Sequence, residues 1–250
     1  MKKIIFLLLC FLSVQLFASE VEEMLQKGNR LFRDKDYKKA VEVYTEIVNA
    51  GYESSALFYN LGNSYYRTGQ LGYAILNYEK ALRLSPGDAD VKHNLTLANS
   101  KTADKMESFP QFFLFEWWEA VLGAFSLSGW TYTAYFFFIA LLSSIGFYFF
   151  AQSPSHQKIS LISGILLIVL LLFSAALVII KYNREVNIKN GIVVENVVTV
   201  KQSPDEKSGD AFLIHEGLKV TLEDKIDQWI KIKLSDGKVG WLNQNDVRVI

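Results

Sequence analysis

Hydrophobic residues follow three different patterns along this chain. Residues 130–151 and 159–180 are continuous apolar runs without a charge, and residues 4–12 form a shorter run near the start. Between residues 21 and 84, apolar and small residues recur at helical spacing, which predicts several packed helices. From residue 186 onward, apolar and polar residues alternate in short segments, which predicts strands. The chain is therefore expected to combine an α-helical region, an apolar helix pair and an all-β region.

The two long apolar runs predict a transmembrane hairpin. Each run has about 22 residues and would reach about 33 Å as a helix, enough to cross a hydrocarbon core of about 30 Å. The segment between them, residues 152–158, is small and polar and predicts a turn. Ser160 and Gly164 are four positions apart, so a close helix contact is expected there.

The start of the chain is typical of a secretory signal peptide. Lys2 and Lys3 precede the apolar run, and Ala18 offers a small residue before a cleavage point, which predicts a signal over residues 1–18. An uncleaved N-terminal anchor is the alternative. In both cases the basic start stays in the cytoplasm. The regions on either side of the hairpin are then expected on the periplasmic side of a bacterial inner membrane.

An aromatic-rich segment, residues 109–125, precedes the first apolar run. Its rings include Phe112, Phe113, Phe115, Trp117 and Trp118. Such rings favour the headgroup level of a bilayer, so a helix lying on the membrane surface is expected. The alternative is a docking surface for another membrane protein.

A self-similarity at a constant spacing marks the helical region. Gly28, Ala40 and Tyr44 recur as Gly62, Ala74 and Tyr78, and Asn29 and Arg33 recur as Asn63 and Arg67. This spacing of about 34 residues resembles the tetratricopeptide repeat, a helix–turn–helix unit whose small residues let paired helices approach closely. The resemblance predicts an all-α solenoid over residues 19–105, with repeats at about 21–54 and 55–88 and a cap helix at 88–100.

The first helices of such repeats line a concave groove that binds partner peptides. The candidate lining residues are Asn29, Phe32, Arg33, Tyr59, Asn63, Tyr66, Arg67 and His93. Asn29 and Asn60 resemble the asparagines of a carboxylate clamp by position. The basic partners of that clamp would fall at Leu25, Asp90 and Asn94, and none of these is basic, so the alternative is that the lining only solvates the groove.

Residues 186–250 are expected to form a small all-β barrel. Ile230, Ile232 and Leu234 share one face of a strand, and Asp236–Gly237 predicts the hairpin turn after it. Trp229, Asp236–Gly237, Gly240 and Trp241 resemble the motifs of bacterial SH3 domains. Related domains bind cell-wall peptides, although Trp229 and Trp241 could instead belong to the core.

The composition of the chain argues against several classes of function. The chain has 26 basic and 26 acidic residues, and acidic and basic residues are nearly balanced in both charged regions, so nucleic-acid binding has no electrostatic support. The single cysteine, Cys10, and three scattered histidines offer no disulfide, metal site or catalytic cluster. No cofactor is expected. A membrane enzyme would be expected to carry ionisable residues within its apolar runs. These two runs hold none, so an enzyme is the least favoured function.

The order of these parts resembles the E protein of the Bacteroides aerotolerance (Bat) operon. That resemblance implies a non-enzymatic scaffold subunit in an envelope complex linked to oxidative-stress tolerance, with partner subunits that carry von Willebrand A domains. The alternative is a cell-wall sensor that binds peptidoglycan peptides through the SH3-like region.

Overall fold

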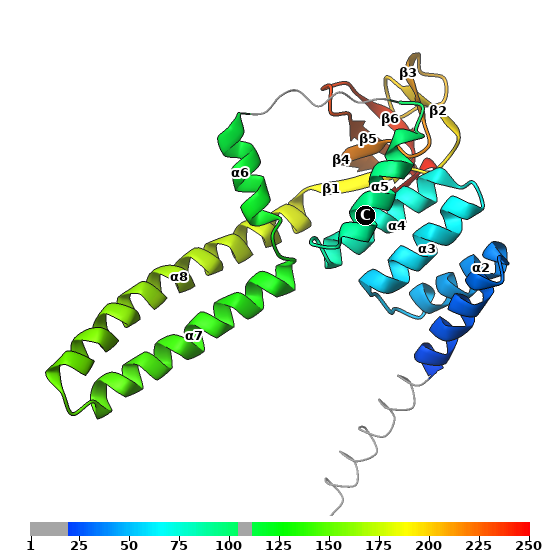
Figure 1. Ribbon diagram of the computed structural model, residues 1–250. Coiled ribbons are helices and arrows are strands. Elements are labelled where there is room, and N and C mark those ends of the chain that lie inside the picture. The colour runs from blue at the N-terminus through cyan, green and yellow to red at the C-terminus, as the bar shows by residue number, and fades with distance from the viewer. Residues whose placement is uncertain (1–19, 105–111) are drawn as a thin grey trace, which may run out of the picture. The chain divides into compact units, whose positions relative to one another are not determined.

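The computed structural model describes residues 20–104 and 112–250 (Figure 1). The expected signal peptide, residues 1–18, lies outside the described residues. The chain divides into two compact units. Among the described residues, one unit holds most of the helical region and the strands, and the other holds residues 112–189 with the short segment 84–87.

The helical region consists of consecutive antiparallel helices. Residues 20–33 are helical, and four helices follow: α2 (Tyr37–Asn49), α3 (Ser55–Arg67), α4 (Leu71–Leu84) and α5 (Ala89–Ser100). Asp36, Ser54 and Asp88 precede α2, α3 and α5, and each accepts a hydrogen bond from a backbone N–H of the first turn. Short polar side chains at these positions pair donors that the helix itself leaves unsatisfied.

Glycine and tyrosine pack together once in each helix pair. A Cβ atom added at Gly28 would lie 2.5 Å from the Tyr44 ring, and one added at Gly62 would lie 2.8 Å from the Tyr78 ring. Both tyrosines are buried. Ala40 and Ala74 are fully buried, and the backbone oxygen of Ala74 lies 3.2 Å from the Cβ position of Gly62. The missing side chains of the glycines leave the space that the aromatic rings fill.

The C-terminal region is an antiparallel seven-stranded sheet. The strands occur in the spatial order β3-β2-β6-β5-β4-β1-β7. Their bounds are β1 (Lys189–Val193), β2 (Val197–Lys201), β3 (Asp210–His215), β4 (Lys219–Ile226), β5 (Trp229–Lys233), β6 (Val239–Asn243) and β7 (Val247–Val249).

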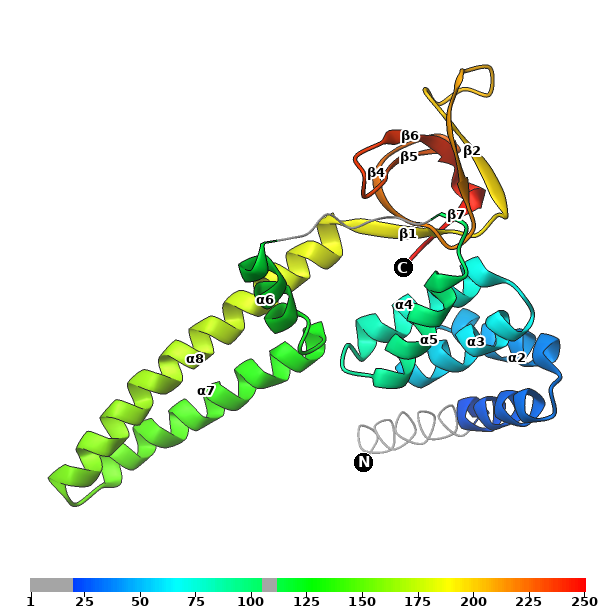
Figure 2. The ribbon, with the colours of Figure 1, turned by 45° about the horizontal axis from the view of Figure 1, so that its top comes forward.

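The sheet curls strongly but is not closed (Figure 2). Its order ends at β3 and β7, and these two strands do not pair with each other. The expected all-β region is confirmed as an antiparallel sheet, but the expectation that it forms a barrel is wrong, because the sheet does not close. The alternation of apolar and polar residues defines the strands and their buried faces, but closure depends on whether the two end strands meet, and a local pattern does not encode that.

The inner face of the sheet carries its own hydrophobic core. The core includes Val200, Ile214, Ile232 and Leu242, all nearly or fully buried. Gly240 lets β6 pass close to β2, because an added Cβ atom would overlap the Val200 side chain.

Polar contacts join α4 to the strand region within the first unit. Glu216 accepts a hydrogen bond of 3.0 Å from the backbone N–H of Gly72 in the first turn of α4. Lys219 forms an ion pair of 2.8 Å with Glu79, and Arg83 donates to the backbone oxygen of Ile250. The carboxylate of Glu216 thus pairs a first-turn donor that a helix leaves unsatisfied.

The second unit is a helical hairpin with a short additional helix. It contains α6 (Phe113–Leu122), α7 (Leu127–Phe150) and α8 (Pro154–Asn187). Among the described residues, α7 and α8 are long and apolar enough to cross a membrane. Helix α8 continues to Asn187, past the apolar run that ends at Ile180. In this extension Arg184 pairs with Glu119 of α6 at 2.8 Å, and Lys181 donates to the backbone oxygens of Leu122 and Phe125.

Replacement of Gly62 by alanine tests the glycine–tyrosine packing. The new methyl group would overlap the Tyr78 ring, so the variant should lose about 1–3 kcal/mol of unfolding free energy, less up to about 1 kcal/mol from better helix propensity. Gly87→Ala is the matched control, because nothing lies within 4 Å of its Cβ position. The unfolding free energies are measured by urea unfolding of the full chain in detergent, followed by circular dichroism. Equal unfolding free energies for the two variants would contradict this packing.

Candidate functional site

A hydrogen-bonded trio of tyrosine and two asparagines occurs twice in the helical region. The Tyr44 hydroxyl donates to Oδ1 of Asn29 at 2.7 Å, and Nδ2 of Asn60 donates to the same oxygen at 3.0 Å. In the second trio, the Tyr78 hydroxyl donates to Oδ1 of Asn63, and Nδ2 of Asn94 donates to that oxygen, both at 2.8 Å. Each trio joins a second helix to its own first helix and to the next first helix.

Burial of the two tyrosines changes their acidity. Loss of water around the hydroxyl raises the pKa of Tyr44 to about 12, while the nearby Arg33 acts in the opposite direction. The pKa of Tyr78 is also raised, again mainly by burial, and Arg67 opposes the shift. Both hydroxyls are therefore protonated donors at physiological pH, as the trios require.

The remaining candidates lie around these trios. Tyr59 accepts a hydrogen bond from Asn94 and lies beside Tyr78, with 6.2 Å between ring centroids. Phe32 makes an edge contact with Tyr37, and the Arg67 guanidinium lies 6.0 Å from the centroid of the same Tyr37 ring. We call this surface the first-helix face. It is defined by the candidates Asn29, Phe32, Arg33, Tyr59, Asn63, Tyr66, Arg67 and His93, together with Asn60 and Asn94.

The two asparagines that resemble a carboxylate clamp are used inside the fold. Asn60 donates to Asn29, and the Asn29 oxygen also holds Tyr44. Asn94, where the clamp would need a basic residue, holds Asn63 and Tyr59 instead. Recognition of a terminal carboxylate by these positions therefore has no support in the geometry.

We add Lys101 to the first-helix face, although it is not among the residues expected there from the sequence. Its ammonium group lies 4.6 Å from the centroid of the Tyr66 ring. Lys101 follows Arg67 by one repeat length, as Arg67 follows Arg33. Lys101 could therefore be identified from the sequence by extending the repeat spacing to the end of the cap helix.

The expected residues of the strand region lie in two environments. Trp229 begins β5 and is buried, whereas Trp241 in β6 is half-buried and pairs with Lys201 and Lys231 across the sheet. Gly240 contacts Val200 and serves the close approach of two strands. Asp236–Gly237 forms the turn between β5 and β6, where Gly237 has a φ of +90°.

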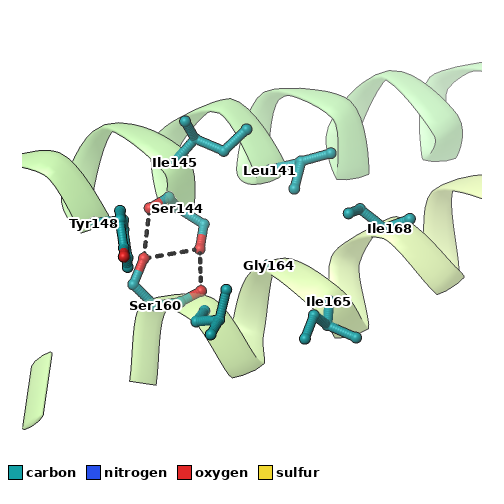
Figure 3. Close-up of a pocket in the computed structure, with 9 residues that line it drawn as sticks. Leu141, Ser144, Ile145, Tyr148, Ser160, Gly164, Ile165 and Ile168 are labelled. Atoms are coloured by element: carbon teal, nitrogen blue, oxygen red, sulfur yellow. Dashed lines mark hydrogen bonds between the residues drawn. The ribbon is translucent and has the colours of Figure 1, made fainter. Parts of the chain in front are cut away.

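A pocket between α7 and α8 is lined by apolar side chains around two serines (Figure 3). The Ser144 hydroxyl donates to the backbone oxygen of Ser160 at 2.9 Å, and the Ser160 hydroxyl donates back to that of Ser144. Gly164 borders the same contact, with its Cβ position 3.6 Å from Oγ of Ser144. The reciprocal bonds satisfy both hydroxyls and hold the helices in register.

Within residues 20–104 and 112–250, no group of three or more histidine, cysteine, aspartate or glutamate side chains is arranged to hold a metal ion. The arrangement of the first-helix face suits binding.

Comparison with known proteins supports the repeat assignment. Residues 55–88 match the family model described as tetratricopeptide repeat. This stretch is a tetratricopeptide repeat. Sperm-associated antigen 1 of Mus musculus is 30% identical over 87 residues, and that of Rattus norvegicus is 30% identical over 77 residues. The match covers 35% and 31% of this chain but only 10% and 9% of the two relatives. This chain therefore spans about a tenth of the length of these relatives, and the similarity does not extend over the whole of either protein.

Alkaline pH tests the buried hydroxyl of Tyr44. Tyrosine in an unfolded chain loses its proton near pH 10, whereas folded Tyr44 keeps it until about pH 12. The stability contributed by this group is therefore fully present below pH 10 and is lost as the pH rises toward 12. Urea unfolding at pH 8, 10 and 11 should show a smaller loss of stability in Tyr44→Phe than in the wild type.

The matched control is Tyr52→Phe, at a half-buried position outside the trios. The role given to burial of Tyr44 would be contradicted if all three proteins lost the same stability above pH 10. These are the wild type, Tyr44→Phe and Tyr52→Phe.

Proposed function

We propose that this protein is a non-enzymatic, membrane-anchored adaptor that binds partner proteins through the first-helix face. The observation that carries the proposal is the tetratricopeptide repeat at residues 55–88 and the repeated side-chain network built on it. Tetratricopeptide repeats generally bind other proteins. The trios fix the first helices to one another, so the face is ordered before a partner arrives, which lowers the entropic cost of binding.

Helices α7 and α8 supply the proposed anchor. Their outward side chains are apolar and exposed, and the serine pair between them leaves no unpaired hydroxyl for lipid to meet. Helix α6 and its N-cap residue Phe112 extend this apolar surface, since Phe112, Phe113, Phe115 and Trp117 are more than half exposed. We propose that α6 lies at the headgroup level and that the ion pair between Glu119 and Arg184 holds it against α8.

The cellular setting rests on the resemblance of the whole architecture. We propose a bacterial inner membrane, with the repeats and the strand region on the periplasmic side, and a Bat-type envelope complex linked to aerotolerance. Subunits with von Willebrand A domains are the proposed partners. The scattered residues of the SH3 resemblance support a second candidate, a cell-wall sensor that binds peptidoglycan peptides near the half-buried Trp241.

Site-specific photo-crosslinking in cells distinguishes these functions. The photoreactive residue p-benzoylphenylalanine would replace His93 or Tyr66 on the first-helix face. Matched controls would place it at Lys38 or Glu46, which are exposed on the second helix α2. We expect discrete larger products on immunoblots from His93 and Tyr66 and none from α2, because only the first-helix face is proposed to contact a partner.

A third position separates the two candidates. Leu213 of β3 is 59% exposed and reports on the strand region. Products from Leu213 alone would favour the sensor. The absence of products from His93 and Tyr66, or the same products from α2, would contradict the adaptor function.

A further inference from the structure

Three basic residues stand at the same place in three successive first helices. Arg33 is the last helical residue of the segment 20–33, Arg67 is the last residue of α3, and Lys101 is the C-cap of α5. Successive members are one repeat length apart, so they form one row along the first-helix face at the carboxyl ends of its helices. We call Arg33, Arg67 and Lys101 the basic row.

The charged groups of the basic row are accessible to a binding partner. All three residues are exposed, and among residues 20–104 and 112–250 none of them has a carboxylate within 4.0 Å. Other cations of the same unit are paired: Lys39 with Asp36, and Lys219 with Glu79. An exposed cation without a counter-ion can meet a carboxylate of a partner at little cost.

Aromatic rings hold two of these cations in place. The Lys101 ammonium group lies over the Tyr66 ring at 4.6 Å, and Arg67 lies 6.0 Å from the Tyr37 ring. Contact with a ring face restricts a long side chain and leaves its hydrogen-bond donors free. The charges therefore stand beside the trios in a defined row.

Most acidic residues near the first-helix face lie away from the basic row or already have a partner. Glu22 and Asp90 belong to the amino-terminal halves of their helices. Asp36 is paired with a lysine of α2, and Asp104 is bonded to a histidine of β3. Asp34 follows the first member of the row in the chain. A hydrogen bond to a histidine does not by itself remove the charge of Asp104. Three cations beside Asp34 and Asp104 still leave an excess of positive charge at the carboxyl-terminal edge of the face.

We infer that the basic row binds an extended acidic segment of a partner protein. This inference rests on the proposed adaptor function and specifies its partner by charge. Neighbouring first helices are in side-chain contact, and packed helices lie about 8–10 Å apart. An extended chain advances about 3.3 Å per residue, so an acidic residue at every third position of the segment would meet successive cations.

The position of the row at helix ends offers a different explanation. A cation at the carboxyl end of a helix stabilises that helix by interaction with its dipole. That role predicts a loss of stability on substitution and no change in affinity for an acidic peptide. Binding and stability must therefore be measured on the same variants.

The test uses the full chain in detergent and a fluorescent peptide, Glu-Ser-Gly repeated four times, with Lys-Ser-Gly repeats as the charge-reversed probe. Fluorescence anisotropy should show binding of the acidic probe alone, weakening as salt shortens the screening length. Single Arg67→Gln should weaken binding about two- to fivefold. The combined variant R33Q/R67Q/K101Q should weaken it about tenfold or more.

The matched control is K38Q/K207Q/K225Q, which removes three exposed cations outside the row. The inference is supported if this variant binds like the wild type while the row variant, with a thermal midpoint close to that of the wild type, does not. It is overturned if the acidic probe does not bind, if both triple variants weaken binding equally, or if the row variant loses only stability. If one of these contradicting results occurs but His93 and Tyr66 still give crosslinks, the adaptor function remains supported and only the acidic nature of the partner is rejected.

Discussion

The first-helix face depends on one shared acceptor in each trio. The side-chain oxygen of Asn29 receives the hydroxyl of Tyr44 and the amide of Asn60, and the oxygen of Asn63 receives Tyr78 and Asn94 in the same way. A buried tyrosine hydroxyl without a partner is costly, so each second helix fixes the rotation of its first helix. The same oxygen then fixes the next first helix. The positions of Tyr59, Tyr66 and the basic row follow from that arrangement.

The polar contacts of the two units differ. In the first unit, contacts of Glu216, Lys219 and Ile250 with α4 join the strand region to the repeats. These contacts involve a second helix and do not include residues of the first-helix face. In the second unit, the hydroxyls of Ser144 and Ser160 are paired between the two long helices, which suits an apolar surrounding.

The sequence predicted those parts of the fold that repeat or alternate locally. The constant repeat spacing identifies the glycine–tyrosine pairs, and the alternation in residues 229–242 identifies the strands. Asn60 and Asn94 are not one repeat length from the asparagines that they contact, so the repeat spacing alone does not reveal the bonds between them. The open edge of the sheet and the cap that Glu216 supplies to α4 depend on residues far apart in the chain. Helix α8 passes the end of its apolar run because Lys181 and Arg184 find partners in and after α6.

Hydrogen exchange of the full chain, with and without the acidic probe peptide, tests the central claim most directly. Binding at the first-helix face predicts slower amide exchange in residues 20–33, α3 and α5, with little change in β5, β6 or the α7–α8 hairpin. Protection confined to the strands around Trp229 and Trp241, or no protection at saturating peptide, would contradict the account.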